Sequence, residues 1–224
     1  MVRPGTLGYR EAWDLQREVV SARQAGVGRD ALFLLEHPRV YTLGKRTDRA
    51  NLLADDSWLA ERDIELVEVD RGGDITYHGP GQLVGYPIFR LASTRGVVGY
   101  VRALEEVLLR ALAALGVHAR RVEGFTGVWV DEAKVAAIGV RVASKGVTSH
   151  GFALNVTTDL DDFAGIVPCG ISDREVCSLA SLGVDTTIDE VGDHVTRAVG
   201  EVFGATLAAA TLDELEHLDR RPVS

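Results

Sequence analysis

Residues 166–171, Ile-Val-Pro-Cys-Gly-Ile, place one of the chain's two cysteines between a proline and a glycine. Proline restricts the backbone on one side and glycine frees it on the other, so Cys169 is expected on a bend rather than inside a regular strand. A free cysteine is either a small buried hydrophobe or, as a thiolate, a nucleophile. These residues alone leave both interpretations of Cys169 open. Cys177, whose neighbours are ordinary, is predicted to be a packing residue.

A cysteine nucleophile needs a nearby cation, because an unperturbed thiol has a pKa of about 8.5 and only the thiolate reacts. The chain has three lysines, Lys45, Lys134 and Lys145. Lys134 stands at the head of the apolar stretch KVAAIGVRV, directly after a predicted turn, where its amine can face a pocket. Its position alone, however, is more typical of a solvated charge.

Residues 71–82, RGGDITYHGPGQ, combine four glycines and a proline with one arginine, one tyrosine and one histidine. Glycine permits positive φ angles and close approach of the backbone to a ligand. The stretch is interpreted either as two surface turns flanking a short strand or as a pocket wall. In the second case its backbone N–H groups can hold an acyl oxygen.

The sequence shows none of the familiar nucleotide-binding or metal-binding motifs. Leu43 to Arg46 lacks the spacing and the Ser/Thr of a Walker motif, and no dinucleotide fingerprint is present. The remaining histidines match no zinc-ligand spacing and are interpreted as surface or satisfied residues: His37, His118, His150, His194 and His217. No metal is predicted.

The elements that must position these residues follow from apolar periodicity. Helices are predicted from Tyr9 to about Gly26, from Val98 to about Gly116, and from Thr187, where Thr187 and Glu190 form a capping box. Strands are predicted at 31–38, 40–44, 64–70, 82–91, 127–130, 134–142 and 148–156. Pro87 suggests an edge strand or a bulge. The turn at 131–133 predicts a hairpin.

This mixed order of helices and strands predicts an α+β (mixed α/β) fold. We expect a single domain over residues 1–224, with a catalytic core of about 28–206. We expect a polar C-terminal tail over 207–224 that is loose at its end.

Composition excludes several classes of protein. The formal net charge of −9 disfavours general binding of nucleic acid. Charged residues interrupt every apolar run well short of a membrane span, so no membrane association is expected. Two cysteines among 224 residues do not form a disulfide framework, which favours a reducing, cytoplasmic setting.

Four motifs in order, RGGDITYHGPGQ, KVAAIGVRV, HGFALN and VPCGI, resemble the octanoyltransferases of lipoic-acid synthesis (lipoyl(octanoyl) transferases). The resemblance runs from about Leu32 to Leu182. It implies the biotin/lipoate protein ligase catalytic fold, a mixed sheet packed by helices with a second small sheet. One departure is visible, since many relatives have VTSL where this chain has Val176-Cys177-Ser178-Leu179.

The resemblance also implies a reaction and its residues. Octanoyl passes from octanoyl-acyl carrier protein to Cys169 as a thioester, and then to a lysine of a lipoyl domain. Lys134 assists the cysteine. The residues implied for substrate binding are Arg71, Gly72, Gly73, Asp74, Ile75, Thr76, Tyr77, His78, Ala137, Ile138, Gly139, Gly151, Phe152 and Ala153. The implied acceptors are lipoyl domains of 2-oxoacid dehydrogenases and the glycine cleavage H protein.

The groups themselves suggest a mechanism without a cofactor. Thioester exchange onto a thiol is nearly isoenergetic, so loading requires no ATP. Lys134 as an ammonium is expected to stabilise the Cys169 thiolate, and in its neutral form to take a proton from the incoming amine. Backbone N–H groups at Gly170 and along Arg71 to Gly73 are expected to stabilise the oxyanion.

Three alternatives stay open from the sequence. They are an ATP-dependent lipoate-protein ligase, an amidotransferase that moves octanoyl between lipoyl-bearing proteins, and a non-catalytic acyl- or lipoyl-domain-binding module. Because carrier proteins and lipoyl domains are usually acidic, docking to this acidic chain requires a local basic face. The candidates for that face are Arg46, Arg49, Arg71, Arg141 and Lys145.

Overall fold

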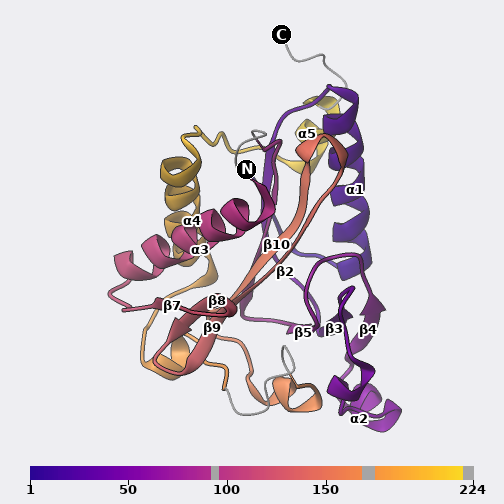
Figure 1. Cartoon of the computed structure of the whole chain (residues 1–224), viewed down its shortest axis with the longest axis vertical. Helices are drawn as coiled ribbons and strands as arrows, with labels where there is room; N and C mark the ends of the chain where they lie inside the picture. The colour runs from indigo at the N-terminus through magenta and orange to yellow at the C-terminus, as the bar shows by residue number, and fades with distance from the viewer. Residues whose placement is uncertain (92–95, 168–174, 219–224) are drawn as a thin grey trace.

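The computed structural model describes residues 1–91, 96–167 and 175–218, without the side chains of 216–218. Within them, a seven-stranded mixed sheet runs through the middle of the molecule in the order β1-β2-β6-β10-β9-β8-β7 (Figure 1). Its first pair, β1 and β2, is parallel, and the remaining pairs are antiparallel. The strands are β1 (Val2–Thr6), β2 (Ala31–Glu36), β6 (Gln82–Ile88), β7 (Arg120–Val122), β8 (Phe125–Val130), β9 (Ala133–Val142) and β10 (Thr148–Asn155).

A second, three-stranded sheet lies beside it, in the order β4-β3-β5. It consists of β3 (Val40–Leu43), β4 (Glu65–Glu68) and β5 (Ile75–His78). The strand β5 lies within the glycine-rich block 71–82, so the predicted short strand between two turns forms there. The mixed α/β fold with a second small sheet, which the resemblance implied, is confirmed.

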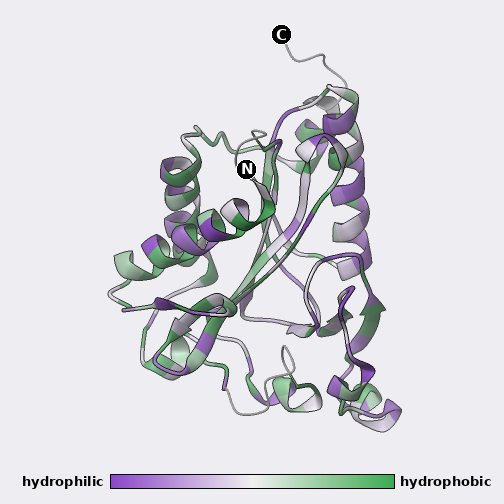
Figure 2. Cartoon of the chain, viewed as in Figure 1, coloured by the Kyte–Doolittle hydropathy of each residue, from purple (hydrophilic) through white to green (hydrophobic). Residues whose placement is uncertain are grey.

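Helices cover both faces of the large sheet. Figure 1 shows α3 (Gly96–Ala114) and α4 (Ile188–Phe203) on one side of the long strands and α1 (Tyr9–Ala25) on the other. Each of these helices mixes hydrophobic and hydrophilic residues along its length (Figure 2). The shorter helices are α2 (Asp56–Glu61) and α5 (Leu212–Leu218), and single 3-10 turns include η3 (Asp161–Gly165).

Local chemistry accounts for the ends of the main helices. The Thr187 hydroxyl accepts from the Glu190 N–H while the Glu190 side chain accepts from the Thr187 N–H, which is the predicted capping box. Helix α1 ends at Gly26, whose φ of 85° is the left-handed C-cap conformation that glycine adopts without strain. The predicted hairpin is also present, with β8 and β9 joined through Asp131.

The position of Pro87 corrects one expectation. The strand β6 is central, between β2 and β10, so the prediction of an edge strand was wrong. The paired residues of β6 and β10 end at Gly85 and Phe152, whereas pairing with β2 continues to Ile88. Beyond that point His150 takes a φ of 56° and donates its N–H to the Gln16 side chain. The proline is tolerated because the ladder to β10 is interrupted where it sits.

The C-terminal region packs against the rest of the fold as far as α5. The Ala210 N–H donates to the Met1 carbonyl, and α5 buries Leu215 against the core on the α1 side of the large sheet. The tail that was expected to be loose at its end comprises residues 207–224. Its last part, 219–224, lies outside the described residues.

Candidate active site

A cavity of about 570 Å³ lies between the glycine-rich block and strands β9 and β10. All of the substrate-binding residues implied by the resemblance line it except Tyr77, and Lys134 lines it as well. Three motifs that are far apart in the sequence thus meet at one place. A volume of this size is typical of small-molecule sites, which usually measure about 300–1,000 Å³.

Two glycines of the cavity lining allow close approach of neighbouring backbones. Gly139 and Gly151 are partners in the β9–β10 pairing. A Cβ on Gly139 would lie 3.0 Å from the Gly72 carbonyl oxygen, and one on Gly151 would lie 2.1 Å from the Gly85 oxygen. The Gly72 N–H donates to the Val140 oxygen at 3.0 Å. Because that bond occupies the N–H, Gly72 is removed from the expected oxyanion donors.

Arg71 has a role that the sequence did not reveal. Its side chain is buried, and its guanidinium donates to the Thr42 carbonyl and hydroxyl at 2.7 and 2.9 Å and to the Gly72 carbonyl at 3.1 Å. It therefore fastens the glycine-rich block to β3 at the edge of the cavity. A buried guanidinium cannot belong to an exposed docking surface.

Three other candidates for the basic docking face have partners within the chain. Arg141 pairs with Asp70 at 3.0 Å, Arg49 pairs with Glu68, and Lys145 donates to the Gln24 carbonyl at the end of α1. Of the five candidates, Arg46 is both exposed and part of the cavity lining.

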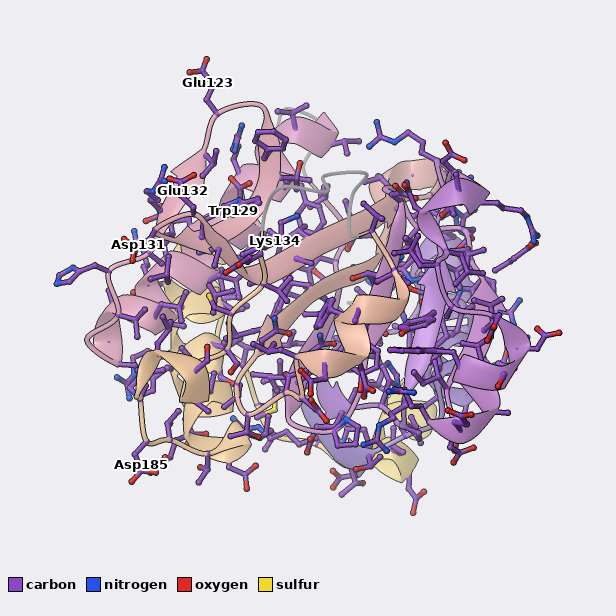
Figure 3. All side chains as sticks on the ribbon, turned by 90° about the horizontal axis from the view of Figure 1, so that it is seen from below. Glu123, Trp129, Asp131, Glu132, Lys134 and Asp185 are labelled. Atoms are coloured by element: carbon purple, nitrogen blue, oxygen red, sulfur yellow. The ribbon has the colours of Figure 1, made fainter. Side chains whose placement is uncertain are left out.

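Lys134 is a buried cation rather than the solvated charge that its position alone suggested, since only 7% of it is exposed. Its Nζ lies 4.8 Å from the centroid of the Trp129 ring, a cation–π distance. In Figure 3 the labelled Trp129 and Lys134 lie next to each other in the interior, whereas Glu123 and Asp185 point outward.

A bulge between β8 and β9 places this lysine. The register shifts between the Val128–Ala136 and Trp129–Lys134 pairs. Gly127, with a φ of 122°, packs against Lys134, whose Cε would lie 3.5 Å from an added Cβ. The buried Glu105 of α3 accepts a hydrogen bond from the Gly127 N–H at 3.2 Å. The lysine side chain is thus held between a glycine backbone and an indole ring.

Cys169 lies outside the described residues. Before it, the Val167 N–H donates to the Asn51 carbonyl at 2.8 Å. After it, the Lys134 N–H donates to the Glu175 carbonyl at 2.9 Å, and the Cys177 N–H donates to the Lys134 carbonyl at 3.0 Å. The chain that resumes at Glu175 therefore runs alongside the start of β9.

Cys177 is a core residue, as its neighbours predicted. It is 6% exposed and packs in the hydrophobic cluster between the large sheet and helices α3 and α4. Burial raises the pKa of its thiol to about 11. A thiol with that pKa is protonated near neutral pH and is a poor nucleophile.

Tyr77 points away from the cavity into the core of the small sheet. Its hydroxyl donates to Asp162 at 2.7 Å, and burial together with that carboxylate raises the pKa of the phenol. Asp162 also pairs with Arg39 at 2.9 Å. The tyrosine thus ties β5 to η3 and does not line the cavity.

The cavity also has a polar end that the sequence did not predict. Tyr9 and Tyr86 line it beside His78, and His37 and His150 lie behind them. Tyr9 lies on the apolar stripe of α1 and Tyr86 on a buried strand, so both read as core residues in the sequence. Further lining residues that it missed are Arg46, Val97, Val101, Gly124, Phe125, Thr126 and Val140.

The described residues contain neither a cluster of three or more His, Cys, Asp or Glu side chains arranged for a metal nor a helix long and apolar enough to cross a membrane.

The comparison with protein families agrees with this geometry. The family described as the lipoyl protein ligase A/B catalytic domain matches residues 8–200. Curated relatives named octanoyltransferase include that of Mycobacterium tuberculosis, 55% identical, with 87% of this chain and 83% of the relative covered. That of Acidobacterium capsulatum is 52% identical, with 89% and 88% covered. The chain belongs to the lipoyl protein ligase A/B catalytic domain family.

Solved structures share the fold at lower identity. A putative lipoate protein ligase from T. acidophilum with bound lipoic acid has a TM-score of 0.78 and 22% identity, with 98% of this chain and 92% of that chain covered. A lipoate-protein ligase A bound with ATP has the same TM-score and identity, with 98% and 93% covered. At that identity the likeness shows the fold alone.

Proposed function

We propose that this enzyme transfers an octanoyl group from octanoyl-acyl carrier protein to a lysine of a lipoyl domain, through a thioester on Cys169. Octanoyl transfer in protein lipoylation is the activity of its curated relatives, which are about half identical to it over most of its length. The enzyme is accordingly an acyltransferase, with lipoyl domains as acceptors. The carrier-protein donor, the thioester and the particular acceptors are our proposal.

The observation that carries the proposed mechanism is Lys134, a buried cation in the wall of the cavity. Keeping an ammonium group away from water is costly unless a negative group accompanies it. A cysteine thiolate is such a group, and a nearby ammonium lowers the pKa of a thiol. The sequence supplies one candidate thiol, Cys169, because Cys177 is buried in the core with a raised pKa.

In the loading step, the Cys169 thiolate attacks the carbonyl carbon of the donor thioester. A new C–S bond forms, the bond to the carrier sulfur breaks, and the released carrier thiolate takes up a proton. No phosphate is consumed, so the step is independent of ATP. Direct transfer of the acyl group from one protein to another is difficult, and the covalent intermediate replaces it with two simpler half-reactions.

The acyl chain is proposed to occupy the cavity between the glycine-rich block and strands β9 and β10. Ala137, Gly139, Gly151 and Ala153 line this part with small side chains, and Phe152 and Ile138 add apolar surface. Such a lining suits an unbranched hydrocarbon, which gains free energy from each methylene removed from water.

Turnover without ATP tests the proposal. Purified wild-type protein, octanoyl-acyl carrier protein and a lipoyl domain are expected to give octanoylated domain in buffer that contains neither ATP nor magnesium. Cys169→Ala abolishes the product, and the matched Cys177→Ala variant retains it. A requirement for ATP, or turnover by Cys169→Ala, would contradict the proposal.

A further inference from the structure

The two half-reactions make opposite demands on Lys134. A thiolate is stabilised by the ammonium form, whereas a lysine that takes the proton of the incoming amine must be neutral. The side chain lies against the Trp129 ring at 4.8 Å, a contact that favours the cation. A separate base would let Lys134 stay charged throughout.

His78 is a second titratable group in the wall of the cavity, and hydrogen bonds fix its tautomer. Its Nδ1 lies 2.7 Å from the Gln82 Oε1. The Gln82 amide is itself oriented, because its Nε2 donates to the Tyr77 carbonyl at 3.2 Å and to the Asn155 Oδ1 at 2.9 Å. An amide oxygen only accepts, so the proton on His78 resides on Nδ1.

His78, Gln82 and Asn155 form a chain of hydrogen-bonded side chains, here called the relay, and Asn155 anchors its far end. Its Nδ2 donates to the Cys177 carbonyl at 3.0 Å, which leaves its Oδ1 facing Gln82. The backbone of Cys177 is in turn bonded to that of Lys134. Backbone carbonyls thus set the orientation of both amides, and through them the orientation of the imidazole.

The other nitrogen of His78, Nε2, opens on the cavity. In the part of the chain that the structure describes it has no hydrogen-bond partner, and it is not among the polar atoms sealed from solvent. The group is 6% exposed and lines the cavity, so that exposure faces the site. It presents a lone pair where substrate is proposed to bind.

The surroundings keep the imidazole neutral. Burial lowers the pKa of His78 well below its usual value, and His37, Arg71 and His150 lower it further, while the hydrogen bond that His78 donates to Gln82 opposes them. The Tyr9 ring stacks on it with centroids 5.9 Å apart. The imidazole is therefore neutral near neutral pH, and Nε2 then carries the lone pair that a general base needs.

The register brings His78 and Lys134 to the same end of the site. Gln82 pairs with Asn155 across β6 and β10. Asn155 follows Leu154, which pairs with Ala136 of β9, two residues from Lys134. The relay therefore ends near the start of β9, where Lys134 lies, and the side chains of His78 and Lys134 line the same cavity.

We propose that His78 is the general base of the transfer half-reaction, an assignment that rests on the proposed function. The neutral amine of the lipoyl-domain lysine attacks the thioester carbonyl carbon and a C–N bond forms. A proton on that nitrogen moves to His78 Nε2. The C–S bond breaks, its electron pair stays on the Cys169 sulfur, and the positive charge of Lys134 is proposed to stabilise the thiolate. The imidazolium then releases its proton to solvent.

Measuring the two half-reactions separately tests this assignment. Loading is followed as release of carrier thiol without acceptor, and transfer as discharge of isolated octanoyl-enzyme onto a lipoyl domain. His78→Asn retains an N–H donor for Gln82 and removes Nε2. We expect it to load near the wild-type rate and to transfer about 100-fold more slowly, since general-base catalysis contributes about 10²–10⁴-fold. Added imidazole restores part of the transfer rate.

Two controls separate the outcomes. His118→Asn removes an exposed imidazole that does not line the cavity, and leaves the ratio of the half-reactions unchanged. If His78→Asn fails to fold, His78→Gln replaces it.

Normal transfer, an equal loss of both half-reactions, or a transfer defect insensitive to imidazole would overturn the assignment. Failure of the wild type to load would instead contradict the proposed function.

Discussion

At the residue scale, burial distinguishes the two cysteines. Cys177 lies in the core with its thiol pKa raised to about 11, and its Sγ is 3.8 Å from the Ala133 carbonyl. The sequence alone leaves the reactivity of a cysteine undecided, whereas the buried surroundings of Cys177 make its thiol a poor nucleophile. Val176 forms a parallel β-bridge with Lys134, and Cys177 follows it directly. Cys177 is a useful control for Cys169 because both cysteines belong to one segment of the sequence.

We therefore predict selective alkylation of the folded protein. Iodoacetamide near neutral pH modifies Cys169 and spares Cys177, because a protonated and buried thiol is neither reactive nor accessible. Peptide mass spectrometry locates the label, and denaturant exposes both sulfurs as a control. Rapid labelling of Cys177 in folded Cys169→Ala protein would contradict this prediction.

Replacing Lys134 by methionine separates its charge from its packing. Methionine keeps an unbranched chain between Gly127 and Trp129 and removes the ammonium. We expect loading to slow by about 100-fold or more, because less of Cys169 is then ionised. Stopped-flow measurement of the loading rate and thermal unfolding of the same sample compare the variant with the wild type. A stable variant that loads at the wild-type rate would remove Lys134 from the mechanism.

At the element scale, η3 is held to the small sheet through one carboxylate. Asp162 is 4% exposed, accepts from the Tyr77 hydroxyl and pairs with Arg39. Its backbone carbonyl accepts from the Tyr41 hydroxyl. These bonds fix the turn that leads to Val167.

Removing that carboxylate is expected to destabilise the fold. Asp162→Ala leaves the buried Tyr77 hydroxyl without its acceptor and Arg39 without its partner, at a cost of about 3 kcal/mol. Tyr77→Phe, which deletes one hydroxyl, costs about 1 kcal/mol. Urea unfolding measures both. Equal midpoints for Asp162→Ala and the wild type would refute the role of Asp162 as an anchor.

Elements with local signals were predicted, and those that depend on distant contacts were not. The stripe of α1 and the Thr187–Glu190 capping box are local patterns. The strand β1 contains Pro4 and Gly5 and forms because it pairs in parallel with β2. Of the two alternatives predicted for Pro87, the edge strand was wrong because β6 is central, and the proline is accommodated where the ladder to β10 is interrupted. Tyr9 and Tyr86 reach the cavity through tertiary packing that no local pattern encodes.

At the scale of the whole molecule, buried neutral histidines make stability depend on pH. Burial lowers the pKa of His37 to about 4, and the pKa values of His78 and His150 are lowered in the same direction. An unfolded histidine has a pKa of about 6.5, so below it the unfolded state binds more protons than the native state. Stability is therefore full above about pH 6.5 and is lost as the pH falls toward 4.

The predicted loss from His37 alone reaches about 3 kcal/mol at pH values near 4. Unfolding free energies from denaturant titrations at about pH 7 and about pH 5 measure its onset. His37→Asn is expected to flatten the dependence while lowering stability at neutral pH. An unfolding free energy that is constant over this range would show that these histidines are not held neutral.

The central claim is that octanoyl resides on Cys169 between two half-reactions, and intact mass spectrometry tests it most directly. Wild-type protein is incubated with octanoyl-acyl carrier protein without ATP, and then a lipoyl domain is added. We predict a single octanoyl adduct that peptide mapping places on Cys169 and that disappears as the domain gains the same mass. A wild-type protein that forms octanoylated domain with no adduct on Cys169, or an adduct that maps to Cys177, would contradict the account.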